Sequence, residues 1–286
     1  MADYTDGWWT SRDGLKLHYR DYPGDEARLP VVCLHGLTRN ARDFAGVARR
    51  LAGARRVIVP EMRGRGDSAY AKDWATYTPL QYVEDVSLLL DELDVARFVS
   101  VGTSMGGLMT FLIAMTRPDR LAGALINDIG PVIDPHGLSR IGAYLGQARS
   151  FPTWMHAARA LEADHAAQFP HWQVTDWLAM AKRVMTLTGN GRIVFDYDMK
   201  IAEPFAQILD AEAQSDLWPG VEALAGVPVA LVRGDLSDLL SVETMAEMLR
   251  RLPLAEGVTV PRVGHAPTLE EPQAAAALDR LLTRTS

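Results

Sequence analysis

The stretch that decides the fold reads Phe98-Val99-Ser100-Val101-Gly102-Thr103-Ser104-Met105-Gly106-Gly107-Leu108. Its first half is β-branched and aromatic, which predicts a buried strand, and the apolar residues that follow recur at helical spacing. Between the two lies the pattern Gly-x-Ser-x-Gly, with Ser104 at its centre. Glycines two residues before and two after the serine let the backbone turn tightly against its neighbours. The stretch therefore predicts a strand–turn–helix that holds a serine hydroxyl above the strand ends, beside a helix N-terminus.

Short apolar runs alternate with helical patterns on both sides of this turn. The predicted buried strands cover residues 31–34, 57–59, 98–102, 123–127, 227–232 and 258–260. Strands that alternate with helices across short connections form parallel β-α-β units. We therefore predict an α/β fold with a mostly parallel, doubly wound sheet. A hairpin over residues 7–22 comes before it, and the alternation in that hairpin predicts that His18 faces solvent.

The alternation stops after Pro131. From about Val132 to Leu217 there is no convincing strand pattern, and the segment is too long for a connecting loop. We predict an α/β core, residues 1–131 and 218–286, and an inserted helical cap, residues 132–217. Four aromatic residues of the cap are candidates for an apolar pocket, so we expect a small-molecule substrate with an apolar part. They are Trp154, Phe169, Trp172 and Trp177.

Composition excludes several other classes of protein. The net charge of −7 argues against binding to nucleic acid or to anionic membrane surfaces. The N-terminus lacks the apolar stretch of a secretory signal, and no apolar run approaches the ~20 residues that span a bilayer. With Cys33 as the single cysteine, these features predict a cytoplasmic protein. No metal or nucleotide motif is present, so we expect neither a metal nor a cofactor.

A serine hydroxyl becomes nucleophilic only when a base lies within hydrogen-bond reach and a third group orients that base. In an open α/β sheet the site lies at the carboxyl ends of the strands. Of the seven histidines, only His35 and His265 lie in loops expected at that edge. His265 follows the last strand, and we predict that it is the general base for Ser104. His35 directly precedes a glycine at a strand end, and we expect it to hold the neighbouring loop.

The orienting acid is expected to follow a strand and to precede the histidine along the chain. Asp235 and Asp238 lie in the loop after residues 227–232, and Asp128, after the preceding core strand, is a third option. These considerations do not separate Asp235 from Asp238. An oxyanion hole needs two backbone N–H groups, and the residue after the nucleophile, Met105, is expected to supply one.

These motifs together resemble the α/β-hydrolase family. The segments His35-Gly36, 63–68, 102–107, 234–238 and Gly264-His265 occur in family order, and the resemblance covers about 31–131 and 226–286. It implies the α/β-hydrolase fold, with a cap domain at the place of the insertion. In relatives with a Ser-Asp pair followed by apolar residues in this loop, that aspartate is the acid, which implies Asp238 ahead of Asp235 and Asp128. The family pattern places the second oxyanion N–H at Leu37.

The predicted function is hydrolysis of a carboxylic ester or lactone through an acyl-enzyme on a Ser104–Asp238–His265 triad. Cleavage of a C–C bond next to a ketone, acyl transfer to an alcohol and perhydrolysis use the same three residues in relatives, so they stay open. A ligand receptor with slow turnover on the same fold is a further alternative. For Arg39 and Asn40, just past the oxyanion loop, we favour a solvated loop over contact with a polar group of the substrate.

Overall fold

The computed structural model describes residues 3–210 and 216–285, and it is built around an eight-stranded sheet. The strand order is β1-β2-β4-β3-β5-β6-β10-β11. The pairs β1–β2 and β2–β4 are antiparallel, and the strands from β4 to β11 pair in parallel. These strands are β1 (Thr5–Thr10), β2 (Lys16–Tyr22), β3 (Val31–Leu34), β4 (Val57–Pro60), β5 (Phe98–Thr103), β6 (Leu121–Asn127), β10 (Val229–Gly234) and β11 (Ala255–Val260). The predicted α/β fold with a mostly parallel sheet is confirmed.

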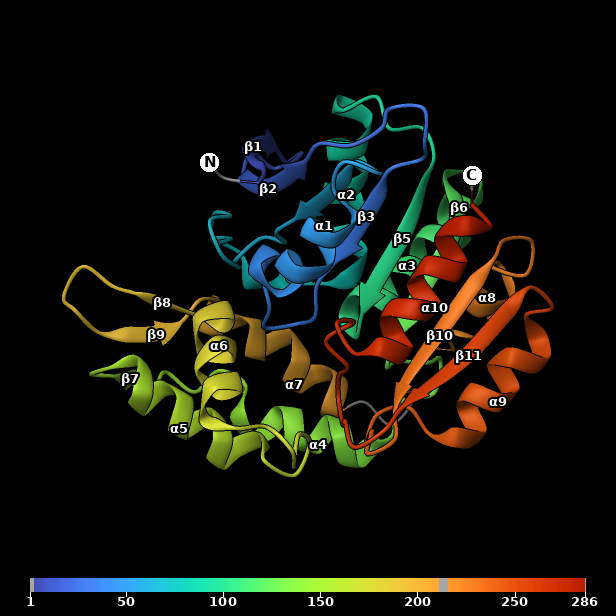
Figure 1. Cartoon of the computed structure of the whole chain (residues 1–286). Helices are drawn as coiled ribbons and strands as arrows, with labels where there is room; N and C mark the ends of the chain where they lie inside the picture. Colours follow the sequence, from blue (N-terminus) through green and yellow to red (C-terminus); the bar gives the residue numbers. More distant parts are fainter. Residues whose placement is uncertain (1–2, 211–215, 286) are drawn as a thin grey trace.

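Helices cover both faces of this sheet (Figure 1). One face packs against α2 (Pro79–Glu92), α3 (Met105–Thr116), α8 (Trp218–Glu222) and α9 (Val242–Arg251). The other packs against α1 (Ala45–Leu51) and α10 (Pro272–Thr283). Within β10, Val229 and Leu231 join the first core while Ala230 and Val232 join the second. The strand side chains alternate between two buried faces, which is why these strands are continuously apolar.

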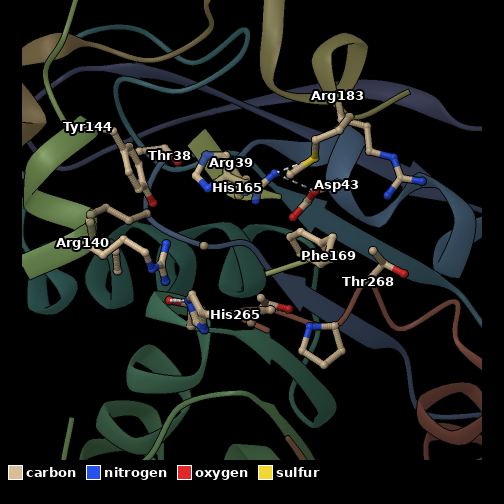
Figure 2. A pocket seen from close by; sticks show the side chains of 18 of the residues that line it. Thr38, Arg39, Asp43, Arg140, Tyr144, His165, Phe169, Arg183, His265 and Thr268 are labelled. Carbon is tan, nitrogen blue, oxygen red and sulfur yellow. Dashed lines mark hydrogen bonds and ion pairs between the residues drawn. The ribbon is translucent and has the colours of Figure 1, made fainter. Parts of the chain in front are cut away.

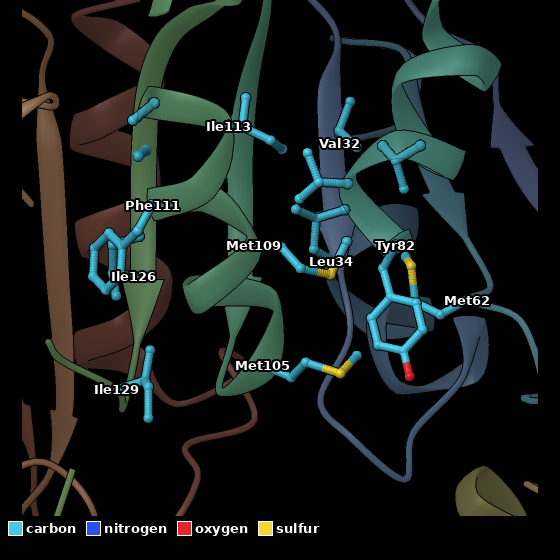
Figure 3. Packing of buried hydrophobic residues seen from close by; sticks show 14 of the residues in the cluster. Val32, Leu34, Met62, Tyr82, Met105, Met109, Phe111, Ile113, Ile126 and Ile129 are labelled. Atoms are coloured by element: carbon cyan, nitrogen blue, oxygen red, sulfur yellow. The ribbon is translucent and has the colours of Figure 1, made fainter. Parts of the chain in front are cut away.

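The first core surrounds the start of α3. Met105 and Met109 on that helix lie in the same buried cluster as Leu34 of β3 and Tyr82 of α2 (Figure 3). Because this packing fixes the first turns of α3, it also fixes the residue that precedes them, Ser104.

The hairpin of β1 and β2 forms as predicted, but the prediction for His18 is wrong. His18 is fully buried. Its ring nitrogens lie 2.9 Å from carboxylate oxygens of Glu61 and of Asp6, and the backbone N–H of His18 donates to the hydroxyl of Ser68. The alternation along β2 predicts a polar face, but it does not reveal that the loop after β4 covers this face.

Within its described residues, the segment between β6 and α8 contains four α-helices: α4 (Pro135–Tyr144), α5 (Trp154–His165), α6 (Val174–Val184) and α7 (Ala202–Asp210). The expectation that it has no strands is wrong. The strands β7 (Ser150–Phe151), β8 (Met185–Leu187) and β9 (Ile193–Phe195) form a small antiparallel sheet of order β7-β9-β8. Strands of two or three residues are too short for a recognisable period. The domain boundaries at 131/132 and 217/218 stay a prediction.

Four short 3-10 helices complete the secondary structure of the described residues: η1 (Ala41–Phe44), η2 (Trp74–Thr76), η3 (Pro118–Arg120) and η4 (Met199–Ile201). In the described part of the chain, no helix has both the length and the apolar character needed to cross a membrane.

Candidate active site

The turn between β5 and α3 holds Ser104 in a strained backbone conformation. Ser104 has φ 54° and ψ −117°, backbone angles that residues other than glycine rarely adopt. A Cβ at Gly102 would lie 2.3 Å from the carbonyl oxygen of Gly106, and a Cβ at Gly106 would lie 1.9 Å from that of Leu34. Both glycines are therefore required by close backbone contacts, as the motif predicts.

The loop after β11 brings His265 to this serine across 161 residues of sequence. Nε2 of His265 lies 2.9 Å from Oγ of Ser104, and Nδ1 lies 2.8 Å from Oδ2 of Asp128. A carboxylate can only accept, so Nδ1 carries the proton, and Nε2 is left to accept from the serine hydroxyl. The structure thus brings together Ser104 and His265 as expected, and it adds Asp128.

Asp128 follows β6 directly and is fully buried. Besides the imidazole, its carboxylate accepts hydrogen bonds from the N–H of Gly234 and the hydroxyl of Ser237, both at 2.8 Å. Three donors therefore hold the carboxylate in place behind His265. The sequence offers Asp128 as the third candidate for the orienting acid, because it follows a core strand.

The prediction that Asp238 contacts His265 is not met. The carboxylate of Asp238 instead forms two hydrogen bonds with the guanidinium of Arg140 on α4, at 2.5 and 2.8 Å. Burial pushes the pKa of Asp238 upward, but the bonds and charge of Arg140 outweigh it and hold that pKa below its usual value. Asp235 accepts from the N–H of Val263 at 3.1 Å and so holds the base of the histidine loop. The acid that contacts His265 is Asp128, and Asp238 is paired with Arg140 of α4.

Gln168, between α5 and α6, ties the histidine loop to the inserted segment. Its side-chain Oε1 accepts from the N–H of His265 at 2.9 Å, and its backbone oxygen accepts from the N–H of Gly264. Its amide nitrogen donates to Asp238 at 3.4 Å. No pattern in the sequence singled out Gln168 or Arg140, since their roles depend on contacts between distant segments.

The loop after β3 passes close to the serine, since a Cβ built on Gly36 would lie 3.7 Å from Cβ of Ser104. Among the described residues, neither the N–H of Leu37 nor that of Met105 donates a hydrogen bond. His35 accepts from the N–H of Met62 through Nε2 at 3.1 Å, so its Nδ1 donates to the carbonyl of Gly36 at 2.8 Å. Burial lowers the pKa of His35 to about 4, which keeps this ring neutral. The expectation that His35 holds the neighbouring loop is confirmed.

Arg65 adds a second restraint on the same loop. This fully buried guanidinium donates through Nε to the carbonyl of Leu37 at 2.9 Å. It also donates to the hydroxyl of Tyr82 at 2.9 Å and to the carbonyl of Arg63 at 2.7 Å. The peptide that carries the Leu37 N–H is thus held from both sides.

A cavity opens above Ser104 and His265, between the sheet edge and the inserted segment (Figure 2). Phe169, Trp172 and Trp177 line it and pack on one another, with ring centroids 4.1 Å apart for Phe169–Trp172 and 4.8 Å apart for Trp172–Trp177. Trp154, the fourth aromatic candidate, is not among the residues that line this cavity. The wall is therefore partly aromatic, as expected for a site that takes apolar groups.

One group of side chains has the composition of a metal site. Ligand atoms of His18, Glu61 and Asp67 lie within 4.8 Å of one another. The carboxylate of Glu61 is already used: it accepts from the N–H groups of Ala41 and Asp67 and pairs with His18. These bonds join the loops after β3 and β4. The cluster therefore has a structural role.

The fold is that of an alpha/beta hydrolase, and the family comparison agrees. The model of the alpha/beta hydrolase family matches residues 31–278. The chain therefore belongs to the alpha/beta hydrolase family and is a hydrolase.

Individual relatives are similar over nearly the whole chain. The 3-hydroxybutyrate-oligomer hydrolase of Cupriavidus necator is 37% identical over 275 residues, which cover 94% of this chain and 93% of that protein. An esterase of Mycobacterium tuberculosis is 28% identical over 252 residues, 85% of this chain and 79% of that protein. The crystal structure of an alpha/beta hydrolase from Novosphingobium aromaticivorans is 56% identical, with a TM-score of 0.95 over 99% of each chain.

Proposed function

We propose that this hydrolase cleaves carboxylic esters through an acyl-enzyme on Ser104, with His265 as the general base and Asp128 as the orienting acid. The observation that carries the proposal is the 2.9 Å contact between Oγ of Ser104 and Nε2 of His265. Asp128 replaces Asp238 in this triad, because Asp128 is the carboxylate in hydrogen-bond contact with the imidazole.

In the first half-reaction, Oγ of Ser104 attacks the ester carbonyl while Nε2 of His265 takes its proton. The imidazolium that forms carries its second proton on Nδ1, next to the carboxylate of Asp128, which stabilises the charge. The negative charge that develops on the carbonyl oxygen is received by the N–H groups of Leu37 and Met105. Each such donor is worth about 3–4 kcal/mol of transition-state stabilisation.

The first half-reaction ends when the proton on His265 passes to the departing alkoxide, which leaves the acyl-enzyme. In the second half-reaction, His265 takes a proton from a water molecule that attacks the acyl-enzyme, and it returns this proton to Oγ of Ser104 as the acid is released. Asp128 is fully buried and has three hydrogen-bond donors, which keeps the imidazole in one orientation through both halves.

The name of one relative and the aromatic wall of the cavity both favour ester substrates. The relative at 37% identity is named for the hydrolysis of 3-hydroxybutyrate oligomers, which are esters of a hydroxy acid. The aromatic wall of Phe169, Trp172 and Trp177 suits an apolar part of the substrate. The same chemistry would open a lactone.

The test is a panel of p-nitrophenyl esters, 3-hydroxybutyrate oligomers and lactones, assayed with the wild-type protein and with Ser104→Ala. We expect ester hydrolysis by the wild type and a loss of about 10⁶-fold in kcat for the variant. A fluorophosphonate probe should label Ser104, as read by peptide mass spectrometry. Labelling elsewhere, or activity that survives in Ser104→Ala, would overturn the proposal.

A further inference from the structure

The cavity above Ser104 carries more positive than negative side chains. Three arginines and one carboxylate are among its lining residues: Arg39, Arg140, Arg183 and Asp43. A purely apolar ester needs no cation in such a site, and a buried cation without a partner is costly. The partners of the three arginines therefore decide which of them is available to a ligand.

Two of the three arginines are hydrogen-bonded to carboxylates. Arg140 makes two short bonds to Asp238, and Arg183 lies 3.3 Å from Glu270. Arg39 forms an ion pair with Asp43, but the two groups are 3.8 Å apart, beyond hydrogen-bond distance. Within the described residues its one hydrogen-bond acceptor is the sulfur of Met180, at 2.9 Å. A thioether is a weak acceptor, so most of the five guanidinium N–H groups remain for a ligand.

Arg39 also lies close to the nucleophile. A Cβ built on Gly36 would lie 3.4 Å from Cγ of Arg39 and 3.7 Å from Cβ of Ser104. The stem of the arginine and the serine therefore flank the same glycine of the oxyanion loop. Figure 2 shows Arg39 beside His165, on the opposite side of the cavity from His265. A group held by the guanidinium would lie in the same cavity as the scissile carbonyl.

Besides Asp43, the ring of His165 lies next to Arg39 (Figure 2), and this ring carries no charge. Burial, and next the charge of Arg39, lower the pKa of His165 to about 4, so this ring is neutral near pH 7. A neutral imidazole can donate one hydrogen bond to a carboxylate beside the guanidinium. The expectation that Arg39 lies in a solvated loop is not met, since its side chain is only 23% exposed. Asn40, the other residue weighed there, is fully buried and caps η1 through its side chain.

We propose that Arg39 binds a free carboxylate of the substrate, so that the preferred substrates are esters that carry a carboxylate a few bonds from the scissile carbonyl. Hydroxy-acid oligomers and half-esters of dicarboxylic acids have this chemistry. The proposal rests on the proposed ester hydrolysis and adds to it the charge of the substrate. A bidentate bond from a planar guanidinium to a carboxylate fixes orientation as well as adding affinity.

The experiment compares each acid with its neutral isostere. One pair is the 3-hydroxybutyrate dimer and its terminal amide, and a second is monoethyl succinate and ethyl succinamate. We expect the wild type to prefer the acid by about 10- to 100-fold in kcat/KM, mainly through KM. Arg39→Gln should remove this preference and leave the amide nearly unchanged, while Arg39→Lys should retain part of it.

Arg183→Gln is the matched control, because it removes the same charge from the same cavity at a residue paired with Glu270. It should change the acid-to-amide ratio by less than about twofold. If Arg183→Gln changed the ratio as much as Arg39→Gln does, the overall positive potential of the cavity, and not a site at Arg39, would set the preference for the acid. The proposal is also overturned if the wild type shows no preference, or if Arg39→Gln slows acid and amide equally.

A binding measurement separates this proposal from the proposed function. Calorimetry on Ser104→Ala should show tighter binding of the acid than of the amide, and the difference should vanish in the Ser104→Ala/Arg39→Gln double variant. If this holds while the wild type hydrolyses no ester, ester hydrolysis is wrong and the carboxylate site stands. If esters are hydrolysed but acid and amide bind equally, the carboxylate site is wrong.

Discussion

The loops after β6 and β10 reach the same edge of the sheet and both present aspartates there, yet they use them differently. Asp128, after β6, is fully buried and accepts from His265, Ser237 and the N–H of Gly234. Asp238, after β10, is 24% exposed at its side chain and is paired with Arg140 of the inserted segment. A carboxylate held by neutral donors keeps its charge available to an imidazolium, whereas one bound by a guanidinium has its charge already compensated.

The segment between β6 and α8 meets the core at the loop after β10. Asp238 receives Arg140 from α4 and the amide of Gln168, and the same Gln168 accepts from the N–H of His265. The loop after β10 is therefore a junction with the inserted segment, and the loop after β6 is part of the proposed triad. Substitutions in the two loops should accordingly affect different properties.

The largest loss of kcat is expected for Asp128→Asn. An amide at this position can accept from Nδ1 only in one orientation and can favour the wrong tautomer, and it no longer stabilises the imidazolium. We expect kcat for a p-nitrophenyl ester to fall by about 10³- to 10⁴-fold, with circular dichroism unchanged. A fall of less than about tenfold would show that Asp128 is not the acid that orients His265.

The next largest loss of kcat is expected at Gln168, which contacts both the histidine loop and Asp238. Gln168→Met keeps the side-chain volume but removes the acceptor for the N–H of His265, which loosens the imidazole relative to Ser104. We expect a loss of about tenfold in kcat with little change in KM. Asp238→Asn, which leaves the acceptor oxygen of Gln168 in place, is the control and should lose less. Equal kcat for the wild type and Gln168→Met would show that the histidine loop holds its place without this bond.

A small effect on catalysis is expected for Asp238→Asn. This aspartate does not contact His265, so kcat should stay within about threefold of the wild type, as it should for Asp235→Asn. The resemblance to relatives predicted the opposite ranking, with Asp238 as the acid. Steady-state kinetics of both variants beside Asp128→Asn decide the matter, and a loss in Asp238→Asn as deep as in Asp128→Asn would restore Asp238 to the triad.

The smallest effect concerns stability and its pH dependence. Because the folded-state pKa of Asp238 lies below its usual value, the Arg140 pair stabilises the fold above the unfolded pKa near 4 and is lost as pH falls through the lower folded value. For a pair about one quarter exposed we expect Asp238→Asn to cost about 1 kcal/mol at pH 7. The cost should shrink below pH ~4. Urea unfolding at the two pH values measures this, and a cost that does not depend on pH would exclude the ion pair as its source.

Much of the fold could be predicted because its signals are local. The continuous apolar runs of the parallel strands reflect burial on both faces of the sheet, and the glycines around Ser104 reflect contacts within one turn. His265 was found because few histidines lie in loops at the carboxyl edge of the sheet. Burial of His18 was missed because a loop about 50 residues further along the chain covers it.

By itself, the sequence determined the α/β fold, the serine turn and the histidine that meets it, because each depends on a periodic pattern or on the order of strands. Only the tertiary structure shows that Asp128, and not Asp238, contacts the imidazole, and that Arg39 pairs with Asp43 without a hydrogen bond. Both outcomes depend on which charged side chains from distant segments meet at one edge of the sheet. Arg140 lies 98 residues from Asp238 along the chain, and electrostatic pairing acts through space, so no local pattern records it.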